Sequence, residues 1–263
     1  MRTRILTIVT IAALALVGCS SGGSAGPAIS SGFGGTGSTS SGTVTGTGGA
    51  SSGSATSATT GSGTGLVALW PFTSVAQVQA WQTSFRTGGS QPWHLDVDRT
   101  ALAFSRDHLG YTEIDRVTTR SVNGTDARLG VGWNDPNETT ATVAVLHLIR
   151  LGGGQDAPWV VVGTDDTLLS LTTPRYGTSV RAPLSVGGLI TGVDESLHVT
   201  VLGPGSSTPL GEVVGIPAGG ERTPWSTTVT FAAPAGTVLT VAVSTGGHLK
   251  TVERFAITAV RVG

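Results

Sequence analysis

The spacing of apolar residues changes along this chain, and each change predicts a different kind of segment. A predominantly apolar stretch from Ile5 to Val17 is followed, over residues 20–65, by nearly all Gly, Ser, Thr and Ala, with no charged side chain. Such a run cannot bury enough apolar surface to offset the entropy lost on ordering, so it predicts a disordered tether. Ordered structure is expected from about Leu66 onward.

Two stretches beyond the tether have the apolar spacing of amphipathic helices. The first helix is predicted at 74–85, where Ser74 and Gln77 match a capping box. The second is predicted at about 97–109, with an aspartate ahead of its first turn and Gly110 as its stop. Each helix would have an apolar face that could cover a sheet.

Beyond Gly110 apolar and polar residues alternate, which is the period of β-strands. Turn residues such as Asn123-Gly124 separate the alternating runs. Strands are predicted at 112–120, 126–133, 140–151, 159–164 and 167–173. Residues 66–174 are therefore expected to form an α+β domain, with two helices on an antiparallel β-meander.

After Pro174 the helical spacing disappears and only short alternating runs remain. Strands are predicted at 183–188, 196–202, 211–216, 225–231, 237–244 and 253–262. A turn is expected at 192–194, and Asp194 and Glu195 are predicted to be solvated there. Many short strands in one region indicate an all-β sandwich at 175–263.

Three stretches of this region resemble a known family. The sequences VRAPLSVGG at 180–188, WSTTVTF at 225–231 and ERFAITAV at 253–260 are similar to the immunoglobulin-like domain of bacterial spore germination proteins. The resemblance implies an immunoglobulin-like β-sandwich at 175–263 that serves as a structural or interaction module of extracytoplasmic proteins. It implies no catalytic residues in this chain.

The N-terminus predicts export and lipid attachment. The apolar stretch follows Arg2 and Arg4, and at about 1.5 Å per residue it is too short to span a bilayer core of about 30 Å, so residues 1–18 are predicted to be a signal peptide. The sequence LVGC, which ends at Cys19, resembles the lipobox of bacterial lipoproteins. The resemblance implies a diacylglyceryl group on Cys19, cleavage before it, and an anchor on the extracytoplasmic side of the cell membrane.

The charge balance argues against a nucleic-acid partner. The formal net charge is −1 and Lys250 is the only lysine, whereas a phosphate-binding surface needs clustered basic side chains. Attachment to the membrane is therefore expected through the lipid on Cys19 and not through a basic surface. Because the chain has one cysteine, the folded part is expected to be stable without disulfides.

One short motif could carry metal or hydrolytic chemistry. His94, Asp96 and Asp98 offer nitrogen and oxygen ligands at alternate positions, which on a strand would face one way. Because the motif stands ahead of a predicted helix, an N-cap role for Asp96 or Asp98 is favoured. We therefore expect no metal and no cofactor.

Four residues are candidate ligand contacts. His147 lies in the most strongly apolar predicted strand, where a buried imidazole with a hydrogen-bond partner is favoured over a ligand contact. Of the six tryptophans, Trp93, Trp133 and Trp159 are the candidates for stacking on sugar rings, and the alternative is that they fill the core.

Together these patterns predict a non-catalytic, lipid-anchored protein that acts as a binding or assembly module in the bacterial cell envelope, with an envelope protein or the cell wall as partner. Two alternatives remain open. One is a lipoprotein that binds a cell-wall glycan or a small molecule. The other is an envelope hydrolase that uses His94, Asp96 and Asp98, or His147.

Overall fold

The structure of the chain is a computed structural model that describes residues 65–134, 140–247 and 250–263, apart from the side chains of residues 193 and 194. The predicted signal peptide, Cys19 and the tether as far as residue 64 lie outside the described residues. The described residues belong to one compact unit. None of their helices is long and apolar enough to cross a bilayer.

The first half of the described chain is built around a four-stranded antiparallel sheet, sheet A, in the order β1-β2-β3-β4. Its strands are β1 (Arg116–Asn123), β2 (Asp126–Asn134), β3 (Thr140–Arg150) and β4 (Trp159–Thr164). Asn123 pairs with Asp126 across a tight turn in which Gly124 has a φ of 59°, a conformation that glycine adopts without strain. The predicted meander is confirmed for these four strands.

The first helix, α1 (Val75–Gly88), begins as the sequence predicts. The Ser74 hydroxyl accepts a hydrogen bond from the backbone N–H of Gln77 at 3.2 Å. The Gln77 side chain in turn accepts one from the backbone N–H of Thr73 at 2.7 Å. The first bond satisfies a backbone donor that the first turn of a helix leaves free, and the second fixes the residue ahead of the N-cap.

The second helix is shorter than predicted and ends in a different geometry. A 3₁₀ turn, η1 (Pro92–Leu95), leads into α2 (Val97–Ala103), and a π-helical turn, η2 (Phe104–His108), follows. Asp96 is the N-cap, because its carboxylate accepts from the backbone N–H groups of Asp98 and Arg99. The wider π turn extends the helical segment to the stop that the sequence predicts.

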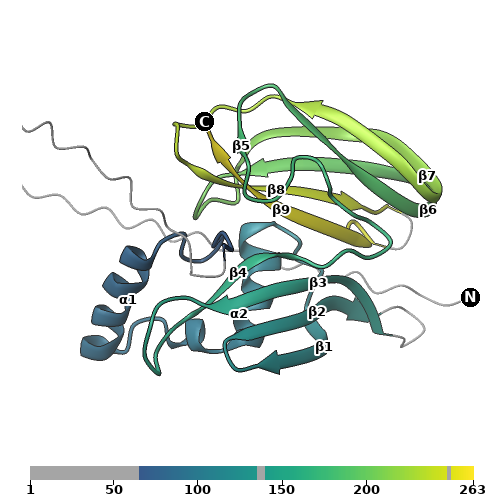
Figure 1. Cartoon of the computed structure of the whole chain (residues 1–263). Helices are drawn as coiled ribbons and strands as arrows, with labels where there is room; N and C mark the ends of the chain where they lie inside the picture. The colour runs from purple at the N-terminus through teal and green to yellow at the C-terminus, as the bar shows by residue number, and fades with distance from the viewer. Residues whose placement is uncertain (1–64, 135–139, 248–249) are drawn as a thin grey trace, which may run out of the picture. The chain divides into compact units, whose positions relative to one another are not determined.

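The rest of the chain forms a five-stranded sheet, sheet B, in the order β5-β9-β8-β6-β7. Its strands are β5 (Ser179–Val180), β6 (Leu184–Leu202), β7 (Pro209–Val229), β8 (Val238–Thr245) and β9 (Arg254–Val262). Figure 1 shows β6 and β7 running together as a long, curved hairpin. The described chain is therefore rich in β-structure and carries its helices in the first half.

The expected turn at 192–194 is wrong. The four strands predicted between residues 183 and 231 merge into two, because β6 and β7 continue through the positions at which breaks were expected. The pairing register shifts on both sides of Gly192, which lies opposite Gly220. A bulge of this kind adds residues and bends the strand without ending it.

Glu195 also departs from the expectation of a solvated turn. Its side chain is only 5% exposed, and the Arg254 guanidinium donates to its Oε1 at 2.9 Å. One carboxylate oxygen, Oε2, has no hydrogen-bond partner among the described residues. Because β6 continues through this position, the Glu195 carboxylate is buried. The positive charge of Arg254 compensates for the hydration that the carboxylate loses.

The strand predicted at 167–173 does not join sheet A. Leu169 bridges Ile190 and Thr173 bridges Gly187, so the segment lies beside β6. Leu169 is fully buried in the apolar cluster of sheet B. The chain therefore crosses from one sheet to the other before residue 174.

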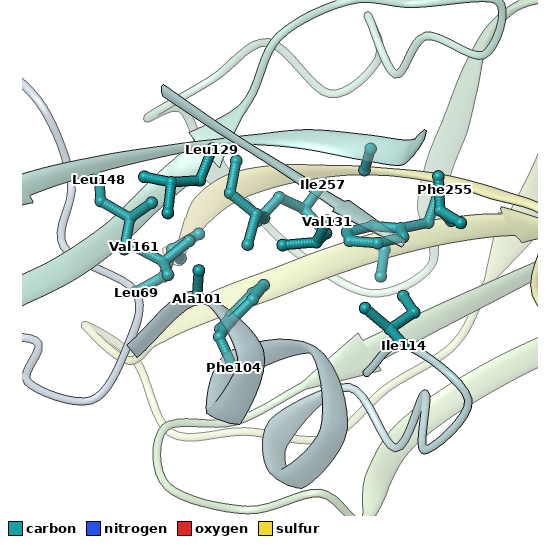
Figure 2. Close-up of a cluster of buried hydrophobic side chains, with 14 of the residues drawn as sticks. Leu69, Ala101, Phe104, Ile114, Leu129, Val131, Leu148, Val161, Phe255 and Ile257 are labelled. Carbon is teal, nitrogen blue, oxygen red and sulfur yellow. The ribbon is translucent and has the colours of Figure 1, made fainter. Parts of the chain in front are cut away.

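The main core lies between sheet A, α2 and one face of sheet B. Figure 2 shows its centre, where side chains from these elements point toward one another: Ala101, Phe104, Leu129, Val131, Leu148, Val161, Phe255 and Ile257. The predicted domains at 66–174 and 175–263 share this core. A second cluster packs Val78 of α1 against Ile149 and Val160, on the opposite face of sheet A.

Candidate functional site

Two of the candidate tryptophans fill the core. Trp133 is 4% exposed and its indole N–H donates to the carbonyl of Val252 at 3.2 Å. Trp159 is 3% exposed, and the Arg150 guanidinium stacks on its ring at 4.7 Å from the centroid. Neither indole offers a free face of the kind that stacks on a sugar ring.

Trp93 is half-buried in an aromatic cluster beside α1 and α2. Its ring centroid lies 5.6 Å from that of Trp70 and 3.8 Å from that of His94. Among the described residues, its ring contacts do not include Trp133 or Trp159. The three candidate tryptophans therefore do not form one stacking platform.

The His94 motif has structural partners. His94 is 2% exposed, and burial lowers the pKa of its imidazole to about 4. Asp96 caps α2, and the Asp98 carboxylate accepts from the Arg120 guanidinium at 3.1 Å. Within the described ranges, no group of three or more His, Cys, Asp or Glu side chains could hold a metal ion.

His147 belongs to a chain of polar contacts on sheet A. Its Nε2 lies 2.7 Å from Asp126 Oδ2, and its side chain is 14% exposed. Arg128 donates to the other oxygen of Asp126 at 2.8 Å and to Asp165 at 2.9 Å. The imidazole has the hydrogen-bond partner that the sequence analysis favours, but it is only partly buried and its partner Asp126 is exposed.

A cavity of about 420 Å³ lies where residues 109–113 meet sheet B. Its other walls come from β6, β7, the end of β8 and the segment before β9. Small-molecule sites usually have volumes of about 300–1,000 Å³, so the space is large enough for a small ligand.

Three contacts hold residues 109–113 in position. Ile114, which follows the segment, is fully buried in the core. The Tyr111 backbone N–H donates to the carbonyl of Ser105 at 2.9 Å. The Glu113 carboxylate accepts from the backbone N–H of Thr251 at 3.0 Å and from its hydroxyl at 3.1 Å. The cavity wall is therefore tied to both halves of the chain.

The polar lining of the cavity consists mainly of hydroxyl groups. His198 on β6 lies 3.3 Å from Glu212 on β7 and 3.3 Å from the Thr200 hydroxyl. Burial raises the pKa of Tyr111 to about 12, although a hydrogen bond with Ser244 acts in the opposite direction. The Tyr111 phenol therefore remains neutral at pH 7.

One hydroxyl in the wall has no partner. Thr245 is 1% exposed, and its Oγ1 makes no hydrogen bond within the described part of the chain. A buried polar atom of this kind is normally satisfied by a water or a ligand. The apolar side chains of Leu109 and Val214 complete the wall, and Val214 is 65% exposed. The lining therefore suits a ligand with hydroxyl groups and some apolar surface.

Sequence reasoning did not identify this cavity. Most of its residues are Ser, Thr, Gly, Leu and Val of ordinary strands and loops, and they converge only when segments far apart in the chain pack together. The Glu113–Thr251 contact, for example, joins positions 138 residues apart. A local signal was present only in Gly110, which lies in the cavity wall just after the helical segment ends.

Comparison with known proteins does not assign the cavity. Neither the family models, nor the curated proteins, nor the solved structures gave a match to this chain. A role for the cavity is therefore inferred from its geometry and its lining residues alone.

Proposed function

We propose that this protein is a lipid-anchored, non-catalytic binding protein on the extracytoplasmic side of a bacterial cell membrane. Its ligand would be a small neutral molecule rich in hydroxyl groups, such as a fragment of a cell-wall glycan. The observation that carries the proposal is the cavity beside residues 109–113, whose lining combines hydroxyl groups with apolar side chains. Neutral hydrogen-bonding groups of this kind complement sugar hydroxyls.

The proposed location depends on the N-terminal sequence. The lipobox-like sequence that ends at Cys19 would attach two acyl chains, which are enough for stable anchoring. The tether at 19–65 would let the folded part stand away from the bilayer and reach the wall layer. The likeness of residues 175–263 to the immunoglobulin-like domain of spore germination proteins supports an interaction role, and we propose that relationship for sheet B.

The packing of the candidate catalytic residues favours binding over hydrolysis. His94 is enclosed by aromatic rings, Asp96 caps a helix, and His147 is bonded to Asp126. These side chains do not line the cavity beside residues 109–113. The hydrolase alternative therefore has less geometric support than a binding role.

Retention of the full chain on insoluble peptidoglycan tests the proposal. Ser196→Trp would fill the cavity with an indole and is expected to reduce retention at least about tenfold, because the ligand loses its space.

Ser226→Trp is the matched control, because Ser226 is exposed on β7 but does not line the cavity. It should be retained as well as the wild-type protein. Wild-type protein that does not bind peptidoglycan, or equal retention of the two tryptophan variants, would contradict the proposed ligand site. Soluble glycan fragments should compete for binding of the wild-type protein and of Ser226→Trp alike.

A further inference from the structure

A second hollow, which we call the Arg150 groove, lies at one end of sheet A. It has a volume of about 570 Å³ and is lined by η1, the start of α2, the β1–β2 turn and the facing ends of β3 and β4. Apolar side chains such as Pro92 and Leu95 form part of its wall, and Arg120 and Arg150 bring two guanidinium groups to it. The groove and the cavity beside residues 109–113 have no lining residue in common.

The Arg150 guanidinium is held in a fixed place without an acidic partner. One of its nitrogens donates to the carbonyl of Ala157, and its carbon lies 4.7 Å from the centroid of the Trp159 ring. Stacking on an indole stabilises a cation by about 0.5–2 kcal/mol. No carboxylate among the described residues forms an ion pair with Arg150.

The other charged side chains in the groove already have partners. Arg120 donates to Asp98 at 3.1 Å, and the Asp96 carboxylate caps α2. Arg150 is therefore the cation in this groove whose charge no carboxylate of the described residues offsets. A guanidinium presents parallel N–H groups that match the two oxygens of a carboxylate.

We propose that the Arg150 groove binds a ligand through a single carboxylate group, which accepts hydrogen bonds from Arg150. The neighbouring carboxylates of Asp96 and Asp98 make the groove unfavourable for a phosphate dianion, because like charges at short range repel. The class of ligand is therefore a monocarboxylate with an apolar or amide body, such as the end of a peptide. This site is independent of the function proposed above.

Fluorine NMR of the full chain labelled with 5-fluorotryptophan tests the proposal directly. The chain has six tryptophans, and the signal of Trp159 is assigned as the one lost in Trp159→Phe. Titration with N-acetylglycine should shift the Trp159 signal to saturation. N-acetylglycinamide, which has the same body without the charge, should bind at least about tenfold more weakly, since the charge-assisted bond is lost.

Arg150→Gln should weaken binding of N-acetylglycine at least about tenfold. Arg150→Lys should give an intermediate loss, because it keeps the charge but not the paired N–H groups. Arg116→Gln is the control, since Arg116 pairs with Asp115 and does not line the groove. Calorimetric titration of the same variants measures the affinities without reference to the assignment, and thermal unfolding verifies that each variant is folded.

Four results would overturn the proposal. They are a Trp159 signal that N-acetylglycine leaves unmoved, equal binding of the acid and the amide, unchanged affinity in a folded Arg150→Gln variant, and tighter binding of inorganic phosphate than of N-acetylglycine. A failure of the peptidoglycan assay alone would not affect it, because that assay reports on the other cavity.

Discussion

Acid should destabilise this protein through two buried histidines. His94 and His108 are each 2% exposed, and the Nδ1 atom of each has no hydrogen-bond partner within the described ranges. Burial lowers the pKa of both imidazoles from 6.5 to about 4, and a hydrogen bond with the backbone of Ser206 offsets part of this effect for His108. Both rings are packed against aromatic side chains, which cannot solvate an imidazolium as water does.

The direction of the effect follows from proton binding. Between pH 6.5 and about 4 the unfolded chain protonates these histidines while the folded chain keeps them neutral, so the free energy of unfolding falls as the pH falls through this window. A pKa difference of one unit corresponds to about 1.4 kcal/mol, which sets an upper limit of about 3 kcal/mol for each histidine. Solvent near the rings reduces the effect to about 1–2 kcal/mol each.

Urea unfolding at several pH values from 7.5 to 4.5 measures this effect. We expect the wild-type protein to lose about 2–4 kcal/mol of unfolding free energy across that range, a large part of the total of about 5–15 kcal/mol for a typical domain. His94→Gln and His108→Gln should each remove about half of the pH-dependent loss, whatever they do to stability at pH 7.5. His198→Gln is the control, because the His198 side chain is 41% exposed.

The comparison between variants separates the histidines' part of the pH-dependent loss of stability from the part due to carboxylates, which also titrate near pH 4.5. If the double variant His94→Gln, His108→Gln loses as much stability on acidification as the wild-type protein, the two imidazoles do not control acid stability. The physical account of their burial would then be wrong.

Two further predictions concern the anchor and the contact between the sheets. Cys19→Ala should abolish labelling by palmitate and release the protein from the membrane fraction. Unchanged labelling or fractionation of that variant would rule out the proposed anchor. Gly188→Ala should lower the free energy of unfolding in urea by about 1–3 kcal/mol, because its new Cβ would stand 2.0 Å from the carbonyl oxygen of Ser170. Gly153→Ala, where no atom lies within 4 Å of the new Cβ, is its control, and equal stability of the two variants would show that the segment beside β6 is not tightly packed.

Local signals in the sequence predict most of sheet A and its helices. The Ser74 capping box, the Asp96 cap and the Asn123-Gly124 turn depend on residues within four positions of one another, so a single sequence contains all the information that they need. The strands of sheet A also alternate clearly enough to be found from their period.

Long-range pairing accounts for the errors. The sequence pattern predicts that Glu195 lies in a turn. It is buried instead, because β6 continues through a bulge, and Arg254, 59 positions away, supplies the compensating positive charge. Leu169 reads as part of the meander, yet it bridges Ile190. Alternation predicts that a segment is a strand but not which strand it joins, and that choice depends on packing across the core.

The same dependence on distant contacts explains why the cavity and the core cannot be assigned to one half of the chain. Ala242 and Ile257 of sheet B pack in the same apolar cluster as Leu129 and Val161 of sheet A. The wall at residues 109–113 is held by Ile114 in that cluster and by Thr251 ahead of β9. A ligand in the cavity would therefore touch both halves at once, and binding would stabilise the packing of sheet A against sheet B because it favours only the state in which the two are joined.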